Sequence, residues 1–217
     1  MQRARRWARI ARQSLKGAVV AACERAPARR VITWRGRGTH GTVALTFDDG
    51  PHPEFTYPVL ETLARHDVKA TFFVVGSYAR KHPTVMRAIV EGGHEIGNHT
   101  FNHSIDNLPE EIRLTDEVFE EHGVRARIYR PPYNRLPLRH LAWLAPRGFS
   151  TIIWSHDTRD SLRADGLAHD CPDPNEIRAG DIIIMHDDNQ VCVDELDDLI
   201  RRTHDRGLRF VTTSELV

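Results

Sequence analysis

Apolar positions along the chain predict short strands that alternate with helices. The strands are short apolar runs rich in β-branched residues, and between them lie stretches whose apolar residues recur at spacings of three and four. We predict strands at 43–47, 70–75, 94–97, 126–129, 150–154, 181–185 and 208–211, and helices near 57–66, 84–91, 109–122, 137–144 and 194–206. This alternation is typical of parallel βαβ units.

The predicted fold class is α/β, a distorted (β/α) barrel of about seven parallel strands that is similar to a TIM barrel with one unit missing. A doubly wound open sheet has the same local pattern and is the alternative. The chain of 217 residues is long enough for one well-buried domain. We assign residues 39–217 to that domain and residues 1–38 to a basic N-terminal segment.

Residues 3–22 predict an amphipathic helix with one apolar and one cationic face. Such a helix fits peripheral contact with an anionic membrane surface, and a helix packed on the domain or a solvated tail is the alternative. The longest uninterrupted apolar run before Cys23 is 18–22, shorter than the roughly 7 to 15 residues of an export signal. We therefore expect a protein of the cytoplasm or of the cytoplasmic membrane face.

Charge is distributed unevenly, although the formal net charge is +0. Residues 1–30 hold nine of the 30 basic residues and one of the 30 acidic ones, so the remainder has 21 basic against 29 acidic residues. An acidic body disfavours a nucleic-acid partner, because phosphate contacts need clustered Lys and Arg. The 3 cysteines (Cys23, Cys171, Cys192) follow no metal or redox spacing and predict no disulfide scaffold.

Titratable side chains follow five of the predicted strands. In parallel α/β folds the carboxyl ends of the strands share one face, where chemistry gathers. We therefore expect convergence of the residues at these strand ends: Asp48 and Asp49 after the first strand, His99 and His103 after the third, Arg130 after the fourth, Asp157 and Asp160 after the fifth, and His186 after the sixth.

Asp49, His99 and His103 are the candidate metal ligands. The neighbouring carboxylates of Asp48 and Asp49 are unfavourable unless a positive charge lies beside them. His99 and His103 are four residues apart, so one helical turn would place both imidazoles on the same face. Two histidines and one carboxylate leave coordination positions open. The alternatives are an ordinary Asp-Gly-Pro turn and a chance pair among 13 histidines.

Four segments resemble, in family order, motifs of the polysaccharide deacetylase family, also called the NodB-homology domain or carbohydrate esterase family 4. They are residues 46–50 (TFDDG), 99–103 (HTFNH), 130–133 (RPPY) and 183–186 (IIMH), and the resemblance runs from about residue 42 to 217. A further motif, 157–161 (DTRDS), keeps both acids but has Ser161 where the family usually has Trp. We expect this change to alter a wall of the substrate groove.

The resemblance implies a role for each matching residue. Asp48 is expected to be the catalytic base, oriented by Arg130, and His186 the catalytic acid, tuned by Asp160. A divalent metal is expected, zinc first, with Co²⁺, Mn²⁺ or Ni²⁺ as alternatives. It would bind Asp49, His99 and His103, while oxyanion and substrate contacts are expected at Tyr133, Pro132 and Asp157.

The activity implied by the resemblance is removal of the N-acetyl group from an amino sugar in an oligosaccharide, polysaccharide or glycolipid, with release of acetate. An N-acetylated carbohydrate is thus the expected partner. Two alternatives stay open. One is a deformylase or other amidase acting on a lipid-linked amino sugar, and the other is a catalytically inactive, carbohydrate-binding relative.

Overall fold

The computed structural model describes residues 31–37 and 41–217, so the predicted helix at 3–22 lies outside the described residues. The described chain forms one parallel sheet in the order β1-β6-β5-β4-β3-β2-β8-β7, with β9 paired to β2. Its strands are β1 (Ile32–Thr33), β2 (Thr42–Asp48), β3 (Thr71–Val74), β4 (Glu95–Asn98), β5 (Ile128–Tyr129), β6 (Ser150–Ile152), β7 (His156–Asp157), β8 (Ile182–His186) and β9 (Arg209–Val211).

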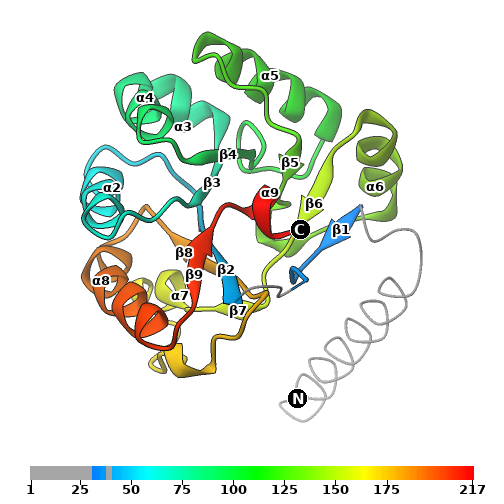
Figure 1. Ribbon diagram of the computed structural model, residues 1–217. Coiled ribbons are helices and arrows are strands. Elements are labelled where there is room, and N and C mark those ends of the chain that lie inside the picture. The colour runs from blue at the N-terminus through cyan, green and yellow to red at the C-terminus, as the bar shows by residue number, and fades with distance from the viewer. Residues whose placement is uncertain (1–30, 38–40) are drawn as a thin grey trace, which may run out of the picture.

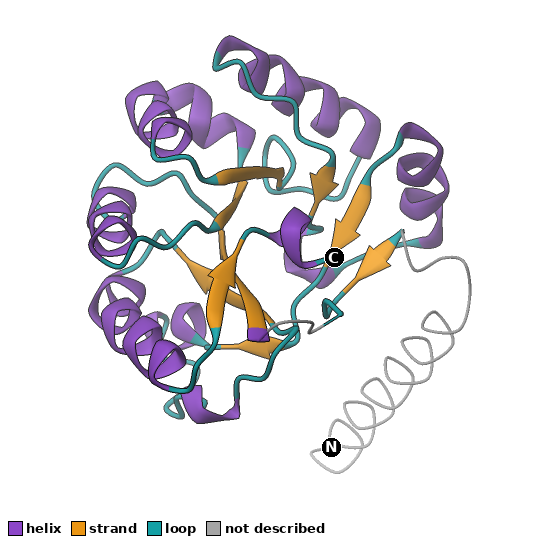
Figure 2. Cartoon of the chain, viewed as in Figure 1, coloured by secondary structure: helices purple, strands orange, loops and turns teal. Residues whose placement is uncertain are grey.

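The larger helices lie around the outside of this curved sheet (Figures 1 and 2). The first and last strands of this order, β1 and β7, do not pair with each other, so the described strands form an incomplete barrel. No described helix is long and apolar enough to cross a membrane. The α-helices are α2 (Thr56–Arg65), α3 (Gly76–Lys81), α4 (Pro83–Glu91), α5 (Leu108–Glu121), α6 (Leu138–Leu144), α7 (Asp160–Ala164), α8 (Gln190–Asp205) and α9 (Thr213–Leu216).

Successive side chains of β2 point to opposite sides of the sheet, and the apolar ones belong to two different clusters. Leu45 and Phe47 belong to the large apolar cluster that also contains helix residues such as Leu63 and Leu196. Ala44 belongs to a second cluster, in which it meets Phe73 from β3. Successive strand residues face opposite sides, so Thr46 and Asp48 share the inner side with Ala44. The last residue of β2 is therefore a carboxylate at the mouth of the barrel.

The inner side is filled by close packing around Phe73. A Cβ at Gly97 would lie 2.4 Å from the Phe73 ring, so glycine on β4 leaves the room that this ring occupies. At the amino ends of the strands, α9 covers the barrel: Thr213 N donates to Thr71 Oγ1 at 2.9 Å, and Leu216 joins the inner cluster. Only the carboxyl ends are thus left for a site.

The structure confirms the α/β barrel class and each of the seven predicted strands. Two further strands, β1 and β7, have two residues each and show no periodicity. Residues 32–33, which we assign to the N-terminal segment, pair with β6, and Arg35 Nε donates to Asp181 at 2.9 Å. The sheet therefore begins before residue 39.

Three short helices, α3, α7 and α9, are not among the predicted ones. The predicted start of α8 at residue 194 is wrong by four residues, because the helix begins at Gln190. Its start is set by Asn189, whose side-chain Oδ1 accepts a hydrogen bond from Cys192 N at 2.9 Å. Such a cap satisfies an N–H group that has no partner within the helix.

Candidate active site

Asp49, His99 and His103 are brought together by loops after β2 and β4. The prediction that a helical turn aligns the two histidines is wrong, because residues 99–103 form no helix. Thr100 and His103 instead have φ values of 67° and 53°, which turn the chain back on itself. The turn is held by Glu111 on α5, which accepts hydrogen bonds from Phe101 N and Asn102 N.

The three side chains fit a divalent metal. One ligand atom from each lies within 4.8 Å of the others. His99 Nε2 and His103 Nε2 lie 3.3 and 3.1 Å from Asp49 Oδ1, yet this buried oxygen has no hydrogen bond of acceptable geometry. His99 Nδ1 lies 2.8 Å from the Arg130 carbonyl oxygen, which fixes the proton on Nδ1 and leaves the Nε2 lone pair free for a metal.

Electrostatics favour the charged form of Asp49. Burial opposes its ionisation, but the neighbouring His103 and His99 outweigh this effect and hold the pKa of Asp49 well below its usual range. The ligand set therefore contains an ionised carboxylate, as a divalent cation requires.

Asp48 is held by the buried cation Arg130. Arg130 is 0% exposed, and its Nη1 donates to Asp48 Oδ1 at 2.7 Å and to Thr46 Oγ1 at 2.8 Å. Its guanidinium also lies 4.0 Å from the centre of the Phe73 ring. Because Thr46 and Phe73 belong to the inner side of the barrel, the core fixes the position of Arg130. Arg130 in turn fixes the orientation of the Asp48 carboxylate through Oδ1.

His186 is the last residue of β8 and is paired with Asp160, the first residue of α7. Asp160 Oδ1 lies 2.9 Å from His186 Nδ1, and Asp160 Oδ2 accepts from His186 N at 2.7 Å. Burial disfavours the imidazolium, but the hydrogen bond and charge of Asp160 outweigh it and raise the pKa of His186 to about 10. Burial likewise opposes ionisation of Asp160, yet the contacts from His186 and Asn189 lower its pKa.

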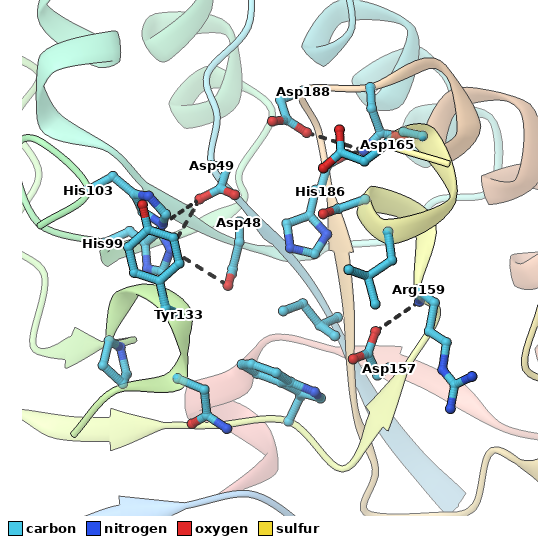
Figure 3. A pocket seen from close by; sticks show the side chains of 18 residues that line it. Asp48, Asp49, His99, His103, Tyr133, Asp157, Arg159, Asp165, His186 and Asp188 are labelled. Atoms are coloured by element: carbon cyan, nitrogen blue, oxygen red, sulfur yellow. Dashed lines mark hydrogen bonds and ion pairs between the residues drawn. The ribbon is translucent and has the colours of Figure 1, made fainter. Parts of the chain in front are cut away.

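An open groove of about 590 Å³ is lined by the three candidate metal ligands together with Asp48 and His186. Figure 3 shows Asp49 beside His99 and His103, with His186 across from them. The other lining residues come from the turn after β5, from the segment between β6 and the end of α7, and from β8 and the loop after it. They include Tyr133, Asn134, Trp154, Asp157, Arg159, Ser161, Leu162, Asp165, Asp188 and Asn189.

The predicted substrate residues occupy different places. Tyr133 is 68% exposed, and its ring centre lies 4.5 Å from that of His103. Asp157 lines the groove while its Oδ1 accepts from Arg159 N at 2.8 Å. Pro132 is buried, and it is Pro131 that lines the groove. Ser161 also lines the groove, so the family's missing Trp would have stood in its wall.

Asp187 is a buried carboxyl to which we assign no role from the sequence. Its Oδ2 accepts from Thr56 Oγ1 at 2.5 Å, while its Oδ1 has no partner. A Cβ at Gly50 would lie 2.3 Å from this carboxylate, so the turn after Asp49 packs directly on it. Burial, together with the charges of Asp188 and Asp49, raises the pKa of Asp187 to about 7.

A comparison with known families decides the assignment. Residues 35–151, more than half of the chain, match the family model described as polysaccharide deacetylase. The chain belongs to the polysaccharide deacetylase family. The motif at residues 183–186 and the pair formed by His186 and Asp160 lie beyond the matched segment, so they add independent residues to the resemblance.

Two curated members of this family show how much of their length is shared. The chain is 37% identical over 183 residues to a Bacillus cereus peptidoglycan-N-acetylglucosamine deacetylase, covering 78% of this chain and 66% of that protein. It is 35% identical over 199 residues to a Sinorhizobium fredii chitooligosaccharide deacetylase, covering 82% and 92%. The chain thus spans about two thirds of the first relative and nearly all of the second.

Solved structures show the same fold in active and inactive members. A crystal structure of a peptidoglycan N-acetylglucosamine deacetylase in complex with an N-hydroxybenzamide compound has a TM-score of 0.80 and 33% identity, covering 87% of this chain and 94% of that one. A family pseudoenzyme from Bacillus anthracis has a TM-score of 0.75 and 26% identity, covering 86% and 69%. Activity therefore has to be argued from the residues of the site.

Proposed function

We propose that this protein removes the N-acetyl group from an amino sugar of an oligosaccharide or polysaccharide, with the aid of a divalent metal, and releases acetate. The observation that carries the proposal is the arrangement of Asp48 and His186, which both line the groove that contains the Asp49, His99 and His103 set. Amide hydrolysis needs a proton acceptor for water and a proton donor for the departing amine.

Each residue has one part in this reaction. A divalent metal on Asp49, His99 and His103 would supply polarisation of the acetyl carbonyl and activation of water. Asp48, oriented by Arg130, accepts a proton from the attacking water. The backbone N–H of Tyr133 is the proposed donor to the developing oxyanion.

His186 completes the reaction. It gives its proton to the sugar nitrogen as the C–N bond breaks, so that a neutral amine leaves and acetate remains. Its Nδ1 is held by Asp160 at 2.9 Å, which leaves Nε2 as the atom that delivers the proton. The charge of Asp160 keeps the imidazole protonated before this step.

The proposed substrate is a glycan that contains N-acetylglucosamine, and the proposed metal is zinc. Support for the sugar comes from the relatives, which are named for peptidoglycan and for chitooligosaccharides. The open groove of about 590 Å³ also suits a chain of sugars better than a single enclosed one. Two histidines and one carboxylate with open positions suit catalytic zinc.

The test is a mass-spectrometric assay of chitooligosaccharides, peptidoglycan fragments and glycolipids that carry either an N-acetyl or an N-formyl group, with the metal-loaded protein. We expect acetate and a free amine, whereas formate would indicate the deformylase alternative. Asp49→Ala and His103→Ala should lose both bound metal and acetate release, while Asp48→Asn should keep the metal and lose turnover. Near-normal turnover of Asp48→Asn would contradict the assignment of the base.

The second candidate function is carbohydrate binding without catalysis, which the similarity to a pseudoenzyme favours. It requires that the site fail although Asp48, His186 and the metal ligands are all present. Binding of a glycan by the metal-loaded protein, without release of acetate or formate, would support this candidate over the deacetylase.

A further inference from the structure

We propose that Asn189 is a positioning residue that fixes the carboxylate of Asp160 and, through it, the imidazole of His186. This inference rests on the proposed function and deepens it, because it concerns the same proton donor. Asn189 lies between β8 and α8, is 9% exposed and lines the groove.

The amide group of Asn189 reaches the acid pair directly. Its Nδ2 lies 3.3 Å from Asp160 Oδ2, 3.0 Å from the carbonyl oxygen of His186 and 3.2 Å from Asp188 Oδ1. One side chain thus contacts both members of the pair. An amide suits this place because it donates without charge, where a carboxylate would face two others.

The opposite end of the same amide is fixed by α8. Asn189 Oδ1 caps the helix by accepting from Cys192 N at 2.9 Å, and Cys192 is 0% exposed. The side chain is therefore held at both ends and connects a 16-residue helix to the acid pair. A side chain anchored in this way has little freedom to rotate.

Asp160 has few other restraints on the oxygen that Asn189 contacts. Oδ1 is shared by His186 Nδ1 and Thr158 Oγ1, the latter at 3.1 Å, whereas Oδ2 has the backbone N–H of His186 and Asn189. Loss of Asn189 would leave Oδ2 with a single donor. The carboxylate plane, which sets the direction of the imidazole, would then be less well defined.

Comparing an amide with an ester substrate distinguishes a positioning role from a purely structural one, because only the amide needs the proton of His186. An amine needs the proton of His186 to depart, whereas 4-nitrophenolate leaves unaided. Asn189→Ser keeps a capping side chain but removes the amide donor. We expect its kcat on chitooligosaccharides to fall about tenfold with KM nearly unchanged, as for other supporting contacts to a reactive group, while hydrolysis of 4-nitrophenyl acetate changes by less than about twofold.

Gln190→Ala is the matched control. It changes the neighbouring residue, whose side chain bonds Asp194 on the exposed face of α8, and both activities should stay as in the wild type. The second measurement is the NMR signal of the His186 Nδ1 proton, assigned by its loss in His186→Gln. We expect this signal to shift and to exchange faster in Asn189→Ser only.

The outcomes separate the two proposals. A parallel fall of amide and ester hydrolysis, or an unchanged amide rate with an unchanged proton signal, would overturn the positioning role. If the wild type released no acetate from any glycan, the proposed function would fail by itself. The proton signal in Asn189→Ser would then still decide whether Asn189 holds the acid pair.

Discussion

Two ion pairs lie beside the groove. In one pair the anion faces the groove, and in the other the cation does. At the mouth of the barrel the anion Asp48 lines the groove, and the cation Arg130 lies behind it with 0% exposure. On the α7 side the cation His186 lines the groove, and the anion Asp160 lies behind it, also with 0% exposure.

The difference shows how one groove can offer both a proton acceptor and a proton donor. In each pair the hidden partner has the opposite charge and orients the group that meets the substrate. The two hidden partners are supported differently: Arg130 by core residues of the barrel, and Asp160 by Thr158 before α7 and Asn189 at the start of α8. We expect the first pair to matter more for stability than the second.

Arg130→Met should have the largest effect. It leaves the Asp48 carboxylate buried without its cation, so we expect a loss of about 3–5 kcal/mol of unfolding free energy and no measurable acetate release. Urea denaturation and the acetate assay test both. The matched control is Arg127→Met, because Arg127 is exposed and lies 5.6 Å from the Phe149 ring. Equal stability of Arg130→Met and Arg127→Met would contradict the expectation that the buried pair of Arg130 and Asp48 stabilises the fold.

Asp160→Asn should have the next largest effect and should act on catalysis. Without the carboxylate, burial disfavours the imidazolium and only the charges of Asp48 and Asp49 still favour it, so the pKa of His186 should fall well below 10. The ion pair stabilises the fold below pH 6.5, and this contribution is lost as pH rises towards 10, so the variant should lack that dependence. We expect amide hydrolysis to fall by about 10²- to 10⁴-fold.

NMR titration of His186 checks the cause of that loss. Asp170→Asn is the control, because Asp170 is an exposed aspartate that pairs with Arg159 and not with His186. A His186 pKa in Asp160→Asn that stays near the wild-type value would mean that another group keeps the imidazole protonated.

Asp187→Asn sharpens the comparison, because Asp187 is a buried carboxyl to which no described cation is paired. Its pKa of about 7, against 3.8 for an ordinary Asp, means that the folded state favours the protonated form. The destabilisation caused by ionising Asp187 is therefore absent below about pH 4 and grows as the pH rises to about 7. The variant should be more stable than wild type at pH 8, by about 1–4 kcal/mol, and equal at pH 4.

Thermal unfolding at several pH values measures this difference, with the exposed Asp194→Asn as control. A variant less stable than wild type at pH 8 would show that the charged carboxylate is needed by Thr56 or by the turn at Gly50.

Tyr133→Ala should have the smallest effect. The side chain is 68% exposed and contacts His103, but belongs to neither ion pair, and the proposed oxyanion donor is its backbone N–H. We expect kcat on chitooligosaccharides to change by less than about threefold, since no charge is left without a partner. A fall as large as that of Asp160→Asn would move part of the chemistry to the rim of the groove.

Much of the fold was predictable because most of its strands lie within short apolar runs, and even the two-residue strand β5 falls in the predicted run 126–129. The two-residue strands β1 and β7 belong to no such run and are too short to show a period of two. The strand ends also predicted the site, because Asp48, Asp49 and His186 come directly after such runs.

The local geometry of the site was less predictable. The loop at 99–103 has left-handed residues that are Thr and His, neither of which signals a positive φ as glycine does. The setting of Asp187 depends on Thr56, which is 131 residues away in sequence, and that of Asn189 on Asp160, which is 29 residues away. Contacts of this kind are set by tertiary packing and leave no local pattern.

The left-handed residues around the groove also bear on how this protein could adapt to heat. Such a backbone costs on the order of 1–3 kcal/mol at each non-glycine residue. The left-handed residues at or beside the groove are Asp49, Thr100, His103, Tyr133, Asn134 and Arg159. The first four are candidate metal ligands, support the ligand loop or carry the proposed oxyanion donor, so replacing them would cost turnover. Asn134 and Arg159 have no proposed chemistry, and Asn tolerates a left-handed backbone better than Arg does, so selection for thermostability should first replace Arg159.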